Sequence, residues 1–153
     1  MSQLRYGEDT RMRYLLLVSH GTFAPGLHSV LDMLVGKRED ILSCSLRDGE
    51  GADEYVAELE KVVEKIGADD EVIVMGDIIG GSPLTNALNV LAGRGLLAHT
   101  RAFGGVSLPM ALTAAFDLQT DDPLALCEQA LSEGQAAMRE VELDLNEDEE
   151  EDL

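Results

Sequence analysis

The chain has 153 residues, of which 45% are hydrophobic, and a formal net charge of −19 at pH 7. This length suits one domain, because folding at this size removes roughly two-thirds of the unfolded surface from water. The excess of acidic side chains would repel a phosphate backbone, so we expect no nucleic-acid partner. The two cysteines lie far apart without metal-ligand spacing, which argues against a zinc site and indicates a reduced, cytoplasmic setting.

Charge and hydropathy divide the chain into three parts. Residues 1–12 are polar and lack periodicity, which predicts a flexible leader, whereas residues 13–141 carry the patterning of a folded domain. Residues 142–153 contain eight acidic side chains and no basic ones, so we expect a disordered acidic tail. The domain is acidic even without this tail, and a basic patch on a partner protein would suit it. No signal peptide is evident and no apolar run approaches the roughly 20 residues that span a bilayer, so we expect no direct membrane insertion.

Short apolar runs alternate with helical patterns from residue 13 to residue 141. In chain order they predict a strand at 14–19, a helix at 27–35, a strand at 41–46, a helix at 52–66, a strand at 71–76, a helix at 82–91, a strand at 96–103 and helices at 107–116 and 123–141. Residues 22–26 are expected to form a loop. Met33, Met75 and Met110 fall in apolar patterns that are typical of the core.

This order of elements predicts an α/β fold, a doubly wound and mostly parallel sheet with helices on both faces. The first and third strands lack polar alternation, as strands buried on both faces do. From the fold class we infer the strand order 2-1-3-4, in which these two strands are neighbours. Ligands of such sheets enter at the carboxyl ends of the strands, where the strand order reverses, so we expect the chemistry there.

A histidine and an aspartate follow these two strands. His20 comes near the end of RYLLLVSHG at residues 13–21, and Asp77 directly follows EVIVMG at residues 71–76. A histidine after a strand is by itself more often structural, so the prediction depends on Asp77 lying close to His20. Asp77 would then accept a hydrogen bond from one ring nitrogen, fix the tautomer and leave the other nitrogen as a nucleophile. His20 and Asp77 are the predicted catalytic residues.

A glycine-rich turn precedes the helix predicted at residues 82–91. Gly80 and Gly81 permit close approach of the backbone, and Ser82 before Pro83 is a strong helix-start signal, with Ser82 expected as the N-cap. Free N–H groups at such a start, with the Ser82 hydroxyl, form an anion site of phosphate size. Together with an oriented imidazole, this site predicts phosphoryl transfer onto histidine. The sequence lacks a Walker lysine motif, a carboxylate cluster for magnesium and a G-x-G-x-x-G motif, so we expect neither a nucleotide cofactor nor a metal.

These segments together resemble the enzyme IIA domain of the mannose-type (mannose/fructose/sorbose) family of the bacterial phosphotransferase system. The matching stretches are LLLVSHG at residues 15–21, residues 26–34, VMGDIIGGSPLTNAL at 74–88 and GGVSLPMAL at 104–112. The resemblance covers roughly residues 13–141. The resemblance implies that His20 carries the phosphate, that Asp77 pairs with His20 and that residues 80–82 lie beside the phosphate.

The resemblance also implies the partners. His20 would take phosphate from the phosphocarrier protein HPr and pass it to an enzyme IIB unit on another polypeptide, while separate membrane subunits transport the sugar. Relatives are commonly homodimers, so a homodimer is expected. The phosphodonor proteins of dihydroxyacetone kinases carry a similar histidine, but GGSPLTNAL at residues 80–88 favours the sugar-transport branch. Two alternatives stay open: a stand-alone regulatory module that HPr phosphorylates and that signals through protein contacts, and a flavodoxin-like binding domain whose His20 is never phosphorylated.

Overall fold

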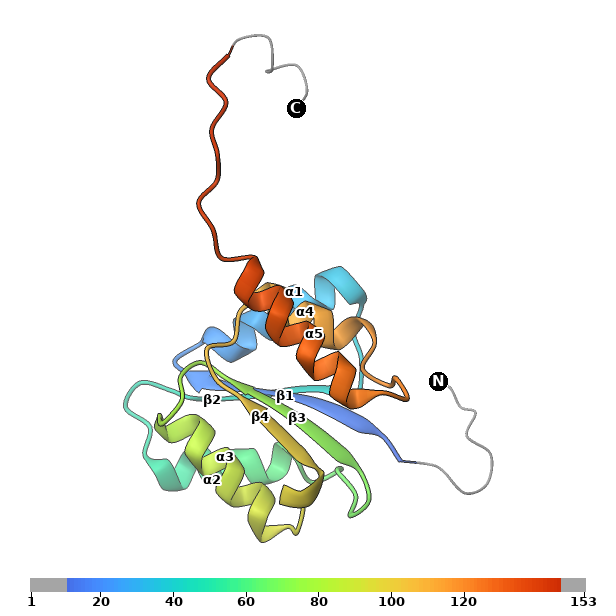
Figure 1. Cartoon of the computed structure of the whole chain (residues 1–153). Coiled ribbons are helices and arrows are strands. Elements are labelled where there is room, and N and C mark those ends of the chain that lie inside the picture. The colour runs from blue at the N-terminus through green and yellow to red at the C-terminus, as the bar shows by residue number, and fades with distance from the viewer. Residues whose placement is uncertain (1–10, 147–153) are drawn as a thin grey trace.

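A parallel sheet of four strands lies at the centre of the computed structural model, which describes residues 11–146 (Figure 1). The strands are β1 (Arg13–His20), β2 (Ile41–Leu46), β3 (Glu71–Gly76) and β4 (Thr100–Phe103), and they lie in the order β2-β1-β3-β4. The predicted strand order is therefore confirmed. Most of the predicted leader at residues 1–12 and more than half of the predicted tail at residues 142–153 lie outside the described residues.

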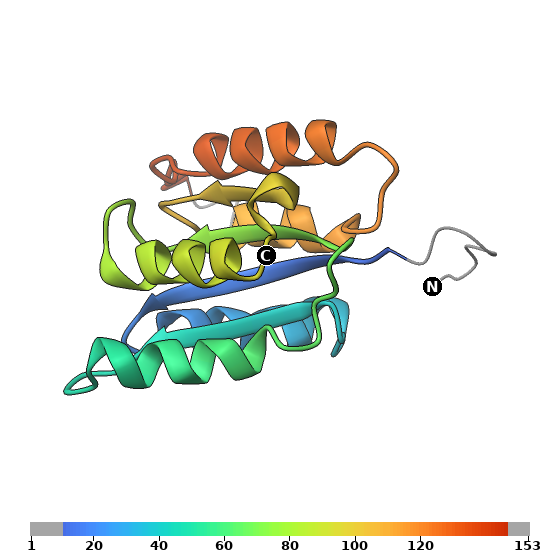
Figure 2. The ribbon, with the colours of Figure 1, turned by 90° about the horizontal axis from the view of Figure 1, so that it is seen from below.

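Helices cover both faces of the sheet (Figures 1 and 2). One face carries α1 (Phe23–Val35), α4 (Leu108–Phe116) and α5 (Pro123–Ala136), and the other carries α2 (Ala52–Val62) and α3 (Ser82–Gly93). A short 3₁₀ helix, η1 (Leu97–His99), precedes β4. The doubly wound α/β fold is confirmed. Every helix within residues 11–146 is too short or too polar to cross a membrane.

The central position of β1 explains its uninterrupted apolar run. Leu15 and Leu17 pack into the core beneath α1, α4 and α5, whereas Leu16 and Val18 pack into the core against α2 and α3. All four side chains are 0% exposed. Because successive residues of a strand face opposite sides, a strand covered on both faces buries every side chain in its middle and shows an unbroken apolar run there. β1 thus joins the two cores and fixes the point at which His20 leaves the sheet.

Several element boundaries differ from the predictions. α1 begins at Phe23 and not at residue 27, because Pro25 lies in its first turn, where a residue without an N–H group is tolerated. α2 ends early because a tighter turn follows it, in which Ile66 N donates to Val63 O over 3.0 Å. α5 ends at Ala136 because the residues that follow bury no apolar face that could stabilise another turn. β4 begins late because η1 occupies the residues before it.

The structure confirms Met75 and Met110 as core residues but not Met33, which is 82% exposed. The buried face of α1 is set by Leu27 and Leu31, which are one helical turn apart. Met33 follows Leu31 by two positions and therefore lies about 200° around the helix from it. The core assignment of Met33 was wrong because the apolar residues of α1 extend beyond the face that meets the sheet.

Candidate active site

His20 and Asp77 meet at the carboxyl end of the sheet. β1 ends at His20, and Asp77 directly follows β3, the neighbouring parallel strand. His20 Nδ1 lies 2.9 Å from Asp77 Oδ2, and the His20 backbone N–H donates to the same oxygen over 3.0 Å. The side chain of His20 is 45% exposed, against 20% for that of Asp77. The structure thus brings the two predicted catalytic residues together and leaves the imidazole open to solvent.

The hydrogen bonds around Asp77 hold it as a carboxylate. Its Oδ1 accepts from the Ile78 N–H over 3.0 Å, in addition to the two bonds that reach Oδ2 from His20. Burial raises the pKa of Asp77, but the hydrogen bonds from His20 and Ile78 and the attraction of the His20 ring together outweigh burial, so the pKa lies below its ordinary value. An ionised carboxylate only accepts hydrogen bonds, so His20 Nδ1 carries the ring proton. Nε2 is therefore the nitrogen with the free lone pair.

Gly81 lies against the imidazole. A Cβ atom at this position would be 2.9 Å from His20 Cε1 and 3.0 Å from Ile78 Cγ1, so no side chain fits here without displacing its neighbours. The preceding Gly80 has a φ of +85°, which favours glycine. Gly81 is the N-cap of α3, and the first turn of that helix contains no acidic side chain. The backbone at the start of α3 therefore approaches Cε1, the carbon between the two ring nitrogens.

Ser82 is the first residue of α3 and not its N-cap, so the predicted cap was wrong by one position. Gly81 already has the extended backbone of a cap residue, with φ −80° and ψ 158°, and no side chain caps the helix. Ser82 Oγ instead accepts a hydrogen bond from Asn86 Nδ2 over 2.9 Å, and the same amide donates to Ser82 O over 3.1 Å. Ser107 and Asp122, by contrast, cap α4 and α5 with their side chains. The Ser82 hydroxyl is consequently not engaged by its own helix start.

Ser19 ties the end of β1 to the start of α1, a role that the strand pattern does not reveal. Its side chain is fully buried, and its Oγ donates to the His20 carbonyl over 2.9 Å and accepts from the Ala24 N–H over 2.7 Å. Thr22 makes no side-chain hydrogen bond as N-cap of α1, so Ser19 supplies that acceptor. The sequence signal for this role is a hydroxyl residue at the end of an otherwise apolar strand.

Exposed apolar side chains flank the histidine and aspartate in the chain. Phe23 at the start of α1 is 46% exposed, and Ile78 and Ile79 directly after Asp77 are 54% and 82% exposed. We call these three residues the apolar rim. Exposed apolar side chains beside a reactive group are typical of surfaces that meet another protein.

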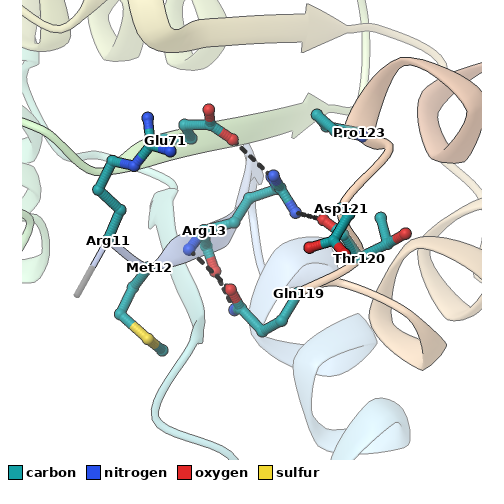
Figure 3. Close-up of a pocket in the computed structure, with 8 residues that line it drawn as sticks. All are labelled: Arg11, Met12, Arg13, Glu71, Gln119, Thr120, Asp121 and Pro123. Atoms are coloured by element: carbon teal, nitrogen blue, oxygen red, sulfur yellow. Dashed lines mark hydrogen bonds and ion pairs between the residues drawn. The ribbon is translucent and has the colours of Figure 1, made fainter. Parts of the chain in front are cut away.

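A polar cavity of about 290 Å³ lies at the amino end of β1, opposite to the end that carries His20 (Figure 3). Its lining consists of Arg11, Met12, Arg13, Glu71, Gln119, Thr120, Asp121 and Pro123. Arg13 begins β1 and His20 ends it, so the cavity and the imidazole are separated by about 23 Å of extended chain. The cavity is therefore not part of the His20 site. Within residues 11–146, no three His, Cys, Asp or Glu side chains gather closely enough to hold a metal ion.

The protein is a doubly wound α/β domain. Its histidine, His20, is paired with Asp77 at the point of the sheet where the strand order reverses. The family model of the PTS system fructose IIA component (EIIA-man) matches residues 14–131. The chain belongs to this family and is a mannose-type IIA component of a sugar phosphotransferase system.

Individual relatives agree with this assignment. The PTS system mannose-specific EIIAB component of Escherichia coli K12 is 25% identical over an aligned length of 130 residues, and the match covers 82% of this chain and 39% of that protein. The chain thus spans about two-fifths of the length of the curated relatives it matches. The PTS IIA protein associated with the fucose utilization operon of Streptococcus pneumoniae has a TM-score of 0.74 at 26% identity, with 91% of this chain and 100% of that one covered. The mannose/sorbose specific IIA subunit of Enterococcus faecalis shares the fold, with a TM-score of 0.74 at 24% identity and 88% and 98% of the two chains covered.

Proposed function

We propose that the protein is a cytoplasmic phosphocarrier that accepts a phosphoryl group from phospho-HPr on His20 and passes it to an enzyme IIB unit during sugar uptake. The observation that carries this proposal is the 2.9 Å contact between His20 Nδ1 and Asp77 Oδ2. This contact leaves Nε2 with a free lone pair on a side chain that is 45% exposed. Membership of the IIA family supports the same assignment.

In the proposed reaction, the Nε2 lone pair of His20 attacks the phosphorus carried by the histidine of HPr. The Nε2–P bond forms as the N–P bond of the donor breaks, and the electron pair of the broken bond returns to the donor ring. His20 keeps its Nδ1 proton, so its ring becomes positively charged without any proton transfer. Asp77 stabilises that charge through the 2.9 Å hydrogen bond. Transfer to a nucleophile on the IIB unit then restores the neutral imidazole.

The start of α3 is the proposed site for the phosphoryl oxygens. A helix N-terminus carries partial positive charge, and that of α3 has no side-chain cap to compensate it. A Cβ atom on Gly81 would lie 2.9 Å from Cε1, the carbon bonded to Nε2, so this helix start lies near the reacting nitrogen. We assign the oxygens to the backbone at Gly80 and Gly81 and to Ser82.

The apolar rim is the proposed contact surface for HPr and for the IIB unit. A partner must bring its own reactive group within bonding distance of His20 Nε2, so it must cover the residues around that nitrogen. Phe23, Ile78 and Ile79 would be buried by such a contact. The net charge of −19 favours a partner with a basic surface and would speed its approach.

We also propose a homodimer formed through the edge of the sheet. Within the described part of the chain, β4 pairs only with β3 and its other edge carries no strand. Residues 140–145 extend away from the domain (Figure 1), and they alternate acidic residues with Val141, Leu143 and Leu145, which are 74%, 78% and 88% exposed. Such alternation is typical of a strand with one buried face, so this segment can pair with a free edge in a second copy. Light scattering should give twice the 16.5 kDa of one chain, and Leu143→Asp should give the monomer.

Phosphorylation in vitro tests the central proposal. The protein is incubated with phosphoenolpyruvate, enzyme I and HPr, and its intact mass is measured before and after acid treatment. We expect one acid-labile phosphate on the wild type and none on His20→Ala. A wild type that stays unphosphorylated while HPr in the same tube is phosphorylated would contradict the proposal. Adding a IIB unit then separates transport, in which the phosphate leaves rapidly, from a signalling role, in which it is retained.

A further inference from the structure

Asn86 makes an unusual pair of contacts at the start of α3. Its Nδ2 donates to Ser82 Oγ over 2.9 Å and to Ser82 O over 3.1 Å. Asn86 follows Ser82 by four residues, so both lie on one face of the helix. The Asn86 amide is thereby fixed against Ser82, the first residue of α3. The N-cap of this helix is Gly81, which lies beside the His20 ring.

The Ser82 hydroxyl is used differently from other hydroxyls at helices of this protein. Thr113 Oγ1 donates to Pro109 O over 2.9 Å, and Ser29 Oγ donates to Gly26 O over 2.6 Å. Such donation to a preceding carbonyl is the usual arrangement for Ser and Thr in helices. Ser82 Oγ accepts from Asn86 instead, and its proton meets no acceptor among residues 11–146. A hydroxyl has one proton to donate, and here that proton remains available.

We propose that Asn86 is a positioning residue that holds the Ser82 hydroxyl so that its proton is donated to a phosphoryl oxygen on His20 Nε2. The inference rests on the proposed function. Ser82 directly follows Gly81, where an added Cβ atom would lie 2.9 Å from His20 Cε1, and we therefore place the Ser82 hydroxyl beside the transferred group. Asn86 does not touch that group and acts only through Ser82.

This positioning of the Ser82 hydroxyl requires the N–H donor of the Asn86 amide. Asn86→Ala removes the donor, so the hydroxyl is free to rotate and donates to the phosphoryl oxygen for only part of the time. Asn86→Asp replaces the donor with a carboxylate, which accepts the Ser82 proton and turns it away from the phosphoryl group. The aspartate also places negative charge near the helix N-terminus, where an anion is to bind. Asn86→Asp should therefore be more harmful than Asn86→Ala.

The test compares Ser82→Ala, Asn86→Ala, Asn86→Asp and the double variant Ser82→Ala/Asn86→Ala with the wild type. Asn89→Asp is the matched control, because Asn89 is an exposed asparagine on the same helix. The rate of His20 phosphorylation is measured with phospho-HPr and with phosphoramidate, a small donor that needs no protein docking. Thermal unfolding of each variant monitors the fold.

We expect Ser82→Ala to slow phosphorylation by about 10- to 100-fold, which is the effect of losing one hydrogen bond to a charged group. Asn86→Ala should slow it by about threefold to tenfold with either donor, in kcat and not in KM for phospho-HPr. Asn86→Asp should slow it at least as much as Ser82→Ala, and Asn89→Asp should match the wild type. In the Ser82→Ala background, Asn86→Ala should have no further effect, because its partner is already absent.

Two results would overturn the positioning role while leaving the proposed function intact. One is that Asn86→Ala slows a Ser82→Ala protein by the same factor as the wild type. The other is that Asn86→Asp and Asn89→Asp behave alike. A wild type that gains no phosphate on His20 from either donor would instead remove the proposed function, and the role of Asn86 with it.

Discussion

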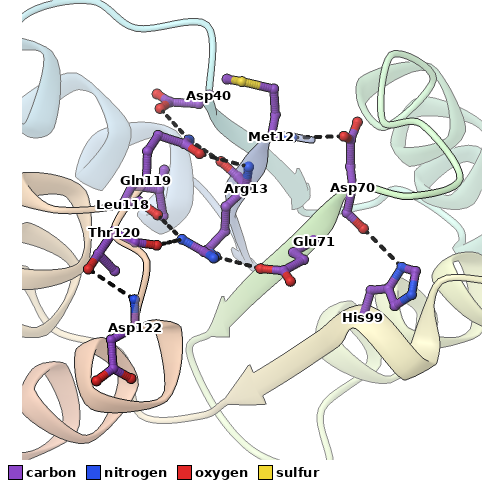
Figure 4. Close-up of polar contacts among 10 residues, drawn as sticks. All are labelled: Met12, Arg13, Asp40, Asp70, Glu71, His99, Leu118, Gln119, Thr120 and Asp122. Atoms are coloured by element: carbon purple, nitrogen blue, oxygen red, sulfur yellow. Dashed lines mark hydrogen bonds and ion pairs between the residues drawn. The ribbon is translucent and has the colours of Figure 1, made fainter. Parts of the chain in front are cut away.

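The two ends of β1 carry polar side chains that the structure uses in opposite ways. At the amino end, Arg13 is 11% exposed and its guanidinium donates to Glu71 Oε1 over 2.7 Å and to the carbonyl oxygens of Leu118 and Thr120 over 2.6 Å and 2.9 Å (Figure 4). At the carboxyl end, the His20 ring is 45% exposed, and its one hydrogen bond to a residue between 11 and 146 runs from Nδ1 to Asp77.

This difference separates a structural polar group from a reactive one. The partners of Arg13 come from distant parts of the chain, so its hydrogen bonds fasten β3 and the segment between α4 and α5 to the start of β1. A buried charge needs such hydrogen-bond partners. Removing either the charge or a partner leaves the remaining buried groups without their hydrogen bonds. His20 is held by one partner on one nitrogen, which orients the ring and leaves Nε2 able to form a new bond. Substitutions at the carboxyl end of β1 should therefore slow phosphorylation, whereas substitution of Arg13 should mainly lower stability.

His20→Ala should abolish phosphorylation, because it removes the only nitrogen proposed to receive the phosphoryl group. The unfolding midpoint in urea should change little, since the side chain is half exposed and is not part of either core. Intact mass and urea titration measure the two effects. His99→Ala is the matched control, because His99 is also exposed and lies in η1, near the other end of the sheet. A phosphate that survives in His20→Ala would place the reaction elsewhere.

Asp77→Asn should slow phosphorylation by about 100-fold, because an amide cannot balance the charge that develops on the ring. The same variant has a pH signature. The pKa of Asp77 is lower in the folded chain than its ordinary value, so the carboxylate stabilises the fold above about pH 4, and that contribution is lost as pH falls through the folded-state pKa. The difference in unfolding free energy between wild type and Asp77→Asn should therefore shrink on acidification. A difference that stays constant from pH 7 to pH 3 would show that Asp77 does not act through its charge.

Gly81→Ala should slow phosphorylation by about tenfold, because the new Cβ would lie 2.9 Å from His20 Cε1 and turn the ring away from Asp77. The backbone at residue 81, with φ −80°, suits alanine, so the loss of stability should be small. Gly93→Ala is the matched control, because that position in the same helix has open space around it. Histidine ring signals in NMR spectra should shift in Gly81→Ala and stay in place in Gly93→Ala.

The sequence predicted those features of this molecule that depend on local patterns. The unbroken apolar runs of β1 and β3 indicate burial on both faces, and burial places both strands in the middle of a parallel sheet. Neighbouring strands then bring His20 and Asp77 to one edge, which is why the pair could be anticipated.

Features that depend on contacts between distant segments could not be predicted in this way. The sequence marks Gly80 and Gly81 as a place where the backbone can approach a ligand, but it does not show that Gly81 lies against the imidazole itself, because that proximity arises from the packing of α3 against β1. The sequence predicts Ser82 as the N-cap of α3, but Gly81 is the N-cap, and the Ser82 hydroxyl accepts a hydrogen bond from Asn86. The partners of Arg13 are 58 to 107 residues away in the chain, so its role is visible only in the folded protein.

Arg13→Leu should leave the rate of phosphorylation within about twofold of the wild type while lowering the free energy of unfolding by about 2–4 kcal/mol. The leucine retains the apolar part of the side chain but leaves Glu71 and two carbonyl oxygens without their donors. The backbone of residue 13 would still be held by Gln119, whose Oε1 accepts from Arg13 N over 3.0 Å and whose Nε2 donates to Arg13 O over 2.7 Å (Figure 4), so the strand should keep its register.

Arg47→Leu is the control for removing an arginine, because the Arg47 side chain is 64% exposed and pairs with Glu58 at the surface, where an ion pair adds little stability. Urea titration should show a much larger loss for Arg13→Leu than for Arg47→Leu. If Arg13→Leu slowed phosphorylation as strongly as Gly81→Ala, the two ends of β1 would be coupled. The amino end would then help to set the position of His20 through the strand itself, and Arg13 would no longer be a purely structural group.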